Sequence, residues 1–63
     1  MEYFEKGEIV YLINVCGEDF KVEILDRFYD IGLKMMFYLV EPVEFKSFIR
    51  EVPYHRCYKK EEI

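Results

Sequence analysis

The chain has 63 residues, of which 52% are hydrophobic, 19% aromatic and 35% charged, and its formal net charge is −4. A chain this short builds one small core and buries only roughly 60% of the surface that its unfolded form exposes. Its aromatic content excludes intrinsic disorder, which goes with few aromatic residues and low hydrophobicity. We therefore predict a single small domain over residues 1–63.

The sequence gives no indication of a membrane protein. Every apolar run is far shorter than the ~20 residues that a transmembrane helix needs. The chain opens on the acidic segment Met1-Glu2-Tyr3-Phe4-Glu5, which has the wrong sign for a secretory leader. We expect a cytoplasmic protein, where free thiols are the default for Cys16 and Cys57. Whether these two cysteines pair stays open.

The first half of the chain predicts two strands. Residues 9–15 are apolar on both faces, which is typical of a strand that is covered on both sides. A turn follows at residues 16–19, and residues 20–25 then alternate between apolar and charged side chains. The alternation slips in phase after Ile24, which indicates a β-bulge or a strong bend.

The second half predicts three further strands. A turn at residues 29–32 leads into a strand at residues 35–41, which Pro42 ends because proline cannot donate to a ladder. A more polar strand follows at residues 47–52. Residues 53–56 are expected to form a single 3₁₀-type turn, and residues 57–60 a short last strand. The predicted fold class is all-β, with five antiparallel strands in one strongly bent sheet.

This layout resembles an SH3-like barrel of the Tudor or KOW type, over roughly residues 4–60. The segments that carry the resemblance are Gly7-Glu8-Ile9-Val10, Val22-Glu23-Ile24-Leu25, Phe37-Tyr38-Leu39-Val40 and Ile49-Arg50-Glu51-Val52-Pro53. The resemblance implies a closed five-stranded barrel with a short 3₁₀ turn before the last strand. The chain lacks the glycine spacing of a KOW motif and the tryptophan of peptide-binding SH3 domains.

The aromatic residues carry the strongest functional signal. Phe4, Phe20 and Phe37 fit the predicted core, but so small a core does not hold all twelve rings with their hydroxyls satisfied. Exposed tyrosine is a common anchor of protein interfaces. The candidate residues for binding a protein partner are Tyr11, Tyr29, Tyr38, Tyr54 and Tyr58.

Basic residues in the second half of the chain favour nucleic acid as an alternative partner. Residues 1–32 hold eight Asp or Glu and three Lys or Arg, whereas residues 33–63 hold five and six. Clusters of Lys and Arg bind phosphate backbones. A nucleic-acid surface would use Arg50, Arg56, Lys59 and Lys60, although the net negative charge disfavours this partner.

Metal and catalytic sites are not predicted. His55, Cys57 and Cys16 are the only soft metal ligands, and they lack the paired spacing of zinc sites. A cysteine nucleophile needs a base within hydrogen-bond reach and a cleft around it, and a domain of this size has little room for one.

We therefore expect a non-enzymatic protein–protein binding module without a cofactor. Its size and style resemble the small accessory or inhibitor proteins that bacteriophages encode. The alternatives are a nucleic-acid-binding barrel and a structural homo-oligomer in which an exposed strand edge pairs between copies.

Overall fold

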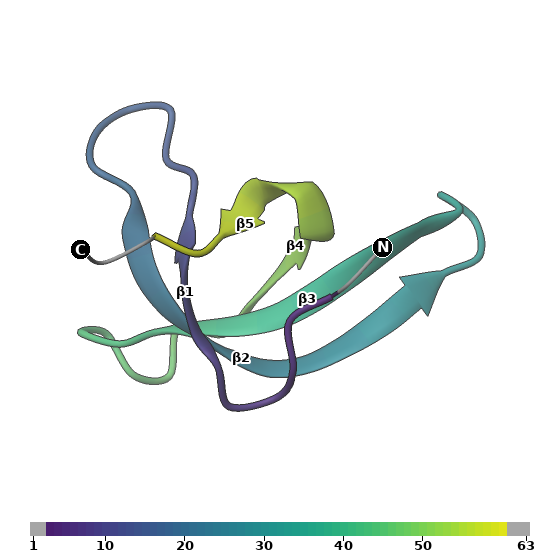
Figure 1. Ribbon diagram of the computed structural model, residues 1–63, viewed down its shortest axis with the longest axis horizontal. Helices are drawn as coiled ribbons and strands as arrows, with labels where there is room; N and C mark the ends of the chain where they lie inside the picture. Colours follow the sequence, from purple (N-terminus) through teal and green to yellow (C-terminus); the bar gives the residue numbers. More distant parts are fainter. Residues whose placement is uncertain (1–2, 61–63) are drawn as a thin grey trace.

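The structure is a computed structural model that describes residues 3–60 as one curved antiparallel sheet (Figure 1). Its elements are β1 (Ile9–Leu12), β2 (Phe20–Asp30), β3 (Met35–Pro42), β4 (Arg50–Pro53), the 3₁₀ helix η1 (Tyr54–Arg56) and β5 (Cys57–Tyr58). The strand order in the sheet is β4-β3-β2-β1-β5. The predicted all-β class, the five antiparallel strands and the short turn before the last strand are confirmed. No ladder joins β4 to β5 within residues 3–60, so the sheet is open rather than a closed barrel.

A β-bulge divides β2 into two parts. Ile24 pairs with Val40, whereas Asp26 pairs with Leu39, so Leu25 is one extra residue on β2. A bulge bends its strand and increases the local twist. The part before the bulge pairs with both β1 and β3, and the part after it pairs with β3. The phase slip predicted this bend correctly, but β2 continues through the bend to Asp30 instead of ending at Leu25.

The core lies on the inner face of the curved sheet and receives side chains from all five strands. Its buried members are Val10, Leu12, Val22, Ile24, Tyr38, Val40, Val52 and Cys57. Two predicted core residues are corrected. Phe20 is 41% exposed because it lies at the end of the β1–β2 ladder, and Phe37 faces outward because alternation places its neighbour Tyr38 inside. Phe4 does pack against the core, as predicted.

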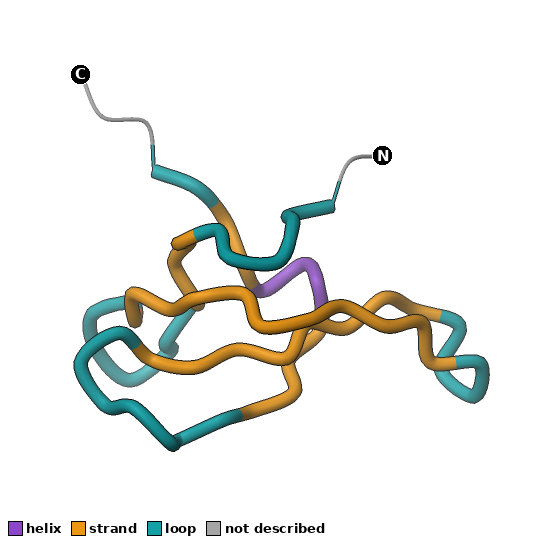
Figure 2. Tube along the Cα trace, turned by 90° about the horizontal axis from the view of Figure 1, so that it is seen from below, coloured by secondary structure: helices purple, strands orange, loops and turns teal. Residues whose placement is uncertain are grey.

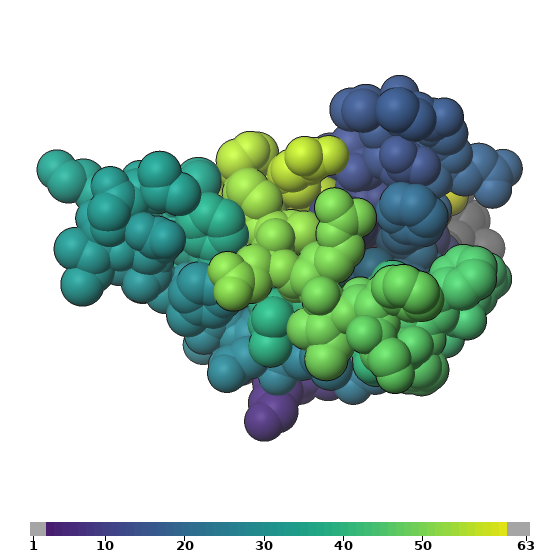
Figure 3. All heavy atoms as spheres, turned by 180° about the vertical axis from the view of Figure 1, so that it is seen from behind, coloured from purple at the N-terminus to yellow at the C-terminus, as the bar shows by residue number. Residues whose placement is uncertain are grey.

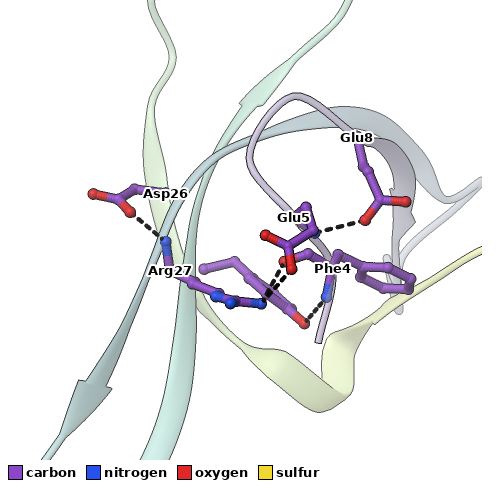
Figure 4. A network of polar contacts seen from close by, with 6 residues as sticks. Phe4, Glu5, Glu8, Asp26 and Arg27 are labelled. Carbon is purple, nitrogen blue, oxygen red and sulfur yellow. Dashed lines mark hydrogen bonds and ion pairs between the residues drawn. The ribbon is translucent and has the colours of Figure 1, made fainter. Parts of the chain in front are cut away.

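The segment before β1 is tied down over this core (Figure 4). The backbone N–H of Gly7 donates to the carbonyl of Ile24 at 2.7 Å, and Gly7 adopts a φ of +94°, which favours glycine. Figure 4 shows the Arg27 guanidinium lying toward the carbonyl of Phe4, at 3.5 Å, and the carboxylate of Glu5, at 3.3 Å. The segment therefore covers the inner face and extends the core beyond the strands.

Several element ends differ from prediction. β1 ends at Leu12 instead of Val15 because the Asn14 and Asp19 side chains close a loop, with Asn14 N donating to Asp19 Oδ1 at 2.9 Å. The β2–β3 turn lies at residues 31–34 instead of 29–32. β4 begins only at Arg50 and β5 ends at Tyr58, so both sheet edges are short, a feature that limits edge-to-edge pairing.

The far end of the β2–β3 hairpin projects from the rest of the sheet as an arm, here residues 28–36. β1 pairs with β2 only over residues 20–23, and β4 pairs with β3 only over residues 37–40, so the arm is a two-stranded ribbon. Figure 2 shows this ribbon extending past the other strands. The molecule therefore has a body with a core and an arm without one.

Candidate functional site

An apolar groove opens on the body between the start of β2, the end of β3 and the loop at residues 43–49. It has a volume of about 340 Å³ and is lined by Leu12, Phe20, Val22, Val40, Pro42, Phe45, Phe48 and Arg50. Its floor is the core itself, because Val22 and Val40 are fully buried. Its walls are three aromatic rings, since Phe20, Phe45 and Phe48 are 41%, 57% and 67% exposed. Such a concave apolar surface is typical of a binding site.

The loop that carries two of these rings is anchored to the sheet. Val43 N donates to the carbonyl of Lys21 at 2.9 Å, which extends the pairing of β3 with β2. Ser47 N donates to Glu41 Oε2 at 2.8 Å, and Lys46 lies 3.7 Å from Glu41 Oε1. These contacts tie the loop to the sheet at Val43, Lys46 and Ser47, and the groove is formed in the structure of the single chain.

The groove continues into an acidic hollow. Phe20, Pro42 and Phe45 line both, and the hollow, of about 260 Å³, adds Glu18, Asp19, Lys21 and Glu44. The Tyr58 hydroxyl and the Asn14 N–H donate hydrogen bonds to the Asp19 carboxylate and lower its pKa. Asp19 is therefore anionic at neutral pH, and one end of the apolar groove is negatively charged.

The five candidate tyrosines do not form one surface. Tyr38 is corrected: it is 2% exposed, and its hydroxyl accepts a hydrogen bond from Phe4 N at 2.9 Å. The hydroxyl satisfies the Phe4 N–H inside the body, and burial raises the pKa of the Tyr38 phenol. It therefore belongs to the core and offers no exposed ring.

The other four tyrosines occupy three places. Tyr11 and Tyr58 stack with ring centroids 5.7 Å apart on neighbouring strands β1 and β5. Tyr54 packs edge-on against Tyr3 near the core. Tyr29 is 57% exposed on the arm. The structure thus brings only Tyr11 and Tyr58 together.

The four candidate basic residues are also divided. Arg50 lines the apolar groove, and Arg56 Nη2 donates to the carbonyl of Ile13 at 3.1 Å. Lys59 and Lys60 do lie together, in a third hollow that also includes Ile9, Tyr11 and Lys21. Lys60 Nζ lies 5.0 Å from the Tyr11 ring centroid, and Lys59 Nζ lies 2.7 Å from Glu8 Oε1.

The two cysteines are free thiols in different environments. Cys16 is exposed, whereas Cys57 is buried in the core. Burial raises the pKa of the Cys57 thiol to about 11, so it is protonated at neutral pH and is a poor nucleophile. Across residues 3–60 no three His, Cys, Asp or Glu side chains gather closely enough to hold a metal ion.

The sequence prediction missed Phe45 and Phe48, which make two walls of the groove. Phe45 lies in the predicted loop after Pro42, and Phe48 lies in the strand predicted at residues 47–52, which begins only at Arg50 in the structure. The signal that marks them is their residue type, because a solvent-facing loop seldom has a fold-related reason to contain phenylalanine.

Comparisons with known proteins do not suggest a function for this chain. No family model, curated protein or solved structure matches this chain. In the part of the chain that the structure describes, no helix is long and apolar enough to cross a membrane.

Proposed function

We propose that this protein is a non-enzymatic protein–protein binding module whose groove receives apolar side chains of a partner protein. The observation that carries the proposal is the exposure of Phe20, Phe45 and Phe48 around an anchored apolar hollow. Exposed contiguous apolar patches on small proteins mark interaction sites. Aromatic residues are enriched at the buried centres of interfaces.

The charges beside the groove select the chemistry of the partner. Glu18, Asp19 and Glu44 line the hollow that shares three residues with the groove, and Lys21 lines it too, so three acidic residues there outnumber one basic residue. The partner segment therefore combines an aliphatic or aromatic side chain with a neighbouring Lys or Arg. Such charge complementarity mainly speeds association and selects the partner.

The proposal extends to the fold and the setting of the protein. The bent β2 and the strand order β4-β3-β2-β1-β5 support an SH3-like arrangement. A cytoplasmic accessory or inhibitor protein, of the kind that bacteriophages encode, is the role that fits a small acidic module of this type. Since a fold does not determine a function, the groove carries the proposal.

Selection from a random library of short displayed peptides tests the groove directly. We expect the wild-type protein to enrich peptides with an aliphatic or aromatic residue next to Lys or Arg. The variant Phe48→Asp should lose roughly tenfold or more in affinity for these peptides, the effect of removing a central interface anchor. Ile49→Asp is the matched control, because Ile49 is 51% exposed but does not line the groove. Equal affinities for the two variants, or enrichment of acidic peptides, would contradict the proposal.

A second candidate function is nucleic-acid binding at the third hollow. The observation that favours it is the gathering of Lys21, Lys59 and Lys60 around the Tyr11 ring. Lysine clusters beside stacking aromatic rings bind single-stranded nucleic acid. Fluorescence anisotropy with a single-stranded oligonucleotide tests this candidate: binding should fall steeply with added salt and weaken in Lys60→Glu. No binding at low salt would remove it.

A further inference from the structure

The tip of the arm is apolar where a turn is usually polar. Ile31 and Leu33 flank Gly32 in the turn between β2 and β3, and their exposed fractions are 82% and 63%. Turns of this kind usually contain Gly, Asn, Asp, Ser or Pro, because these residues adopt the turn conformation or hydrogen-bond to it. The fold does not use the two aliphatic side chains, so they are available to another molecule.

A side-chain hydrogen bond braces the turn at the tip. Asp30 Oδ1 accepts a hydrogen bond from Leu33 N at 3.0 Å, and Lys34 adopts a left-handed φ of +54°. Below the tip the two strands stay in register, with Asp30 opposite Met35. At the base of the arm, the Phe28 and Phe37 rings stack with centroids 5.8 Å apart. A preorganised tip loses little conformational entropy on binding.

The tip and the groove lie at opposite ends of the molecule. In Figure 3 the arm projects at one end of the longest axis, and the loop at residues 43–49 lies toward the other end, together with the loop between β1 and β2. β2 and β3 run between the two ends as continuous paired strands, which prevents a chain from folding its own tip into its own groove. A tip therefore reaches a groove only on a second copy.

We propose that the Ile31–Leu33 tip of one copy docks into the apolar groove of a second copy. The two surfaces match in chemistry: aliphatic side chains meet a hollow walled by phenylalanine, and Lys34, next to the tip, meets the carboxylates of the acidic hollow. A hollow of about 340 Å³ is within the range of roughly 300–1,000 Å³ that encloses small ligands. The inference rests on the proposed function, since it names the partner of the same groove.

The contact is head-to-tail, because it joins different surfaces of the two copies. Each added copy uses one of its two surfaces and leaves the other free, so assembly continues into a ring or an open chain. The contact is also small, which places it among weak interfaces. We therefore expect a concentration-dependent series of species rather than a single stable dimer.

Sedimentation over a concentration series tests the contact. The average mass of the wild-type protein should rise with concentration. The tip variant Ile31→Asp/Leu33→Asp and the groove variant Phe48→Asp should each stay monomeric. A mixture of the two variants should form a heterodimer and nothing larger, because one supplies the intact groove and the other the intact tip. Ile49→Asp should assemble like the wild type.

Three results would overturn the inference: a wild-type protein that stays monomeric at every concentration, a tip variant that assembles like the wild type, or a mixture of variants that stays monomeric. Circular dichroism and denaturant midpoints of each variant separate loss of contact from loss of folding. The two proposals fail differently. A monomeric wild type that still enriches basic apolar peptides contradicts only the contact between copies. A wild type that assembles through Phe48 but binds no peptide in a Phe48-dependent way contradicts only the binding of other proteins.

Discussion

The two ends of the β2–β3 hairpin follow the same ladder but have opposite environments. Near β1 and β4 the hairpin buries Val22, Ile24 and Val40 completely, whereas beyond β4 it exposes Ile31 and Leu33. The residue types are similar at both ends. The difference is that β1 and β4 pair with one end of the hairpin, whereas no other strand of residues 3–60 pairs with the arm. A two-stranded ribbon has no core of its own.

This difference separates stability from interaction. Substitutions in the body act on the free energy of unfolding, because a core packed to high density tolerates little loss of volume. Substitutions at exposed positions of the arm act on its binding to other molecules rather than on the free energy of unfolding. The variants that follow test this separation, from the largest expected effect on stability to the smallest.

Ile24→Ala should have the largest effect. Ile24 is fully buried next to the bulge, and truncating such a side chain costs about 2–5 kcal/mol of unfolding free energy. Urea denaturation measures the loss. Leu33→Ala is the matched control on the arm, and a shift in its midpoint as large as that of Ile24→Ala would break the distinction between body and arm.

Tyr38→Phe should lower the unfolding free energy by about 1 kcal/mol, because Phe4 N loses its acceptor. The same change should speed amide hydrogen exchange at Phe4, as its segment is released from the inner face. Tyr29→Phe, on the exposed arm, should change neither quantity. Unchanged exchange at Phe4 would show that the hydrogen bond does not hold the segment.

Asp19→Asn should alter the acid dependence of stability. Hydrogen bonds from Tyr58 and Asn14 lower the pKa of Asp19 in the folded state, so the unfolded chain binds a proton more readily. The resulting stabilisation is present above the unfolded pKa, about 4, and disappears as the pH falls through the lowered folded pKa. Asp19→Asn should therefore be less stable than the wild type at neutral pH, and the gap should narrow in acid.

Urea midpoints of the wild type and Asp19→Asn, measured at neutral pH and near pH 3, give the difference in stability on either side of the ordinary aspartate pKa of about 4. Glu18→Gln is the control, since it removes the neighbouring exposed carboxylate of the same loop. A gap that stays constant with pH would contradict the role of the Tyr58–Asp19 hydrogen bond in joining β5 to the loop before β2.

Leu33→Ser should have the smallest effect on folding. Leu33 is 63% exposed at the tip, and surface substitutions of this kind change stability by less than about 0.5 kcal/mol. Self-association, measured by sedimentation, should nevertheless weaken. A clear fall in the urea midpoint would show that the tip stabilises the fold and would remove the contrast between the two ends.

Local patterns predicted the elements more successfully than their environments. The alternation in residues 20–25, the phase slip after Ile24 and the proline before η1 are local signals, and the structure confirms β2, the bulge and η1. Strand ends at Leu12 and Asp30 depend on side-chain hydrogen bonds across loops, which alternation does not reveal.

The candidate site was largely beyond local patterns. Leu12, Phe20, Phe45 and Phe48 line one groove although they come from three separate stretches of the chain. The surplus of aromatic rings correctly indicated that some lie outside the core, but the structure places phenylalanines rather than tyrosines around the groove.

By itself the sequence determined an acidic, aromatic-rich chain of five antiparallel strands with a bend after Ile24, because alternation, turn residues and proline act over a few residues. Only the tertiary structure decided which face is inside where both faces of a strand are apolar. It buried Tyr38, turned Phe37 outward and left Ile31 and Leu33 uncovered. The physical reason is that burial depends on which distant strands cover a residue, and the register between strands sets that cover.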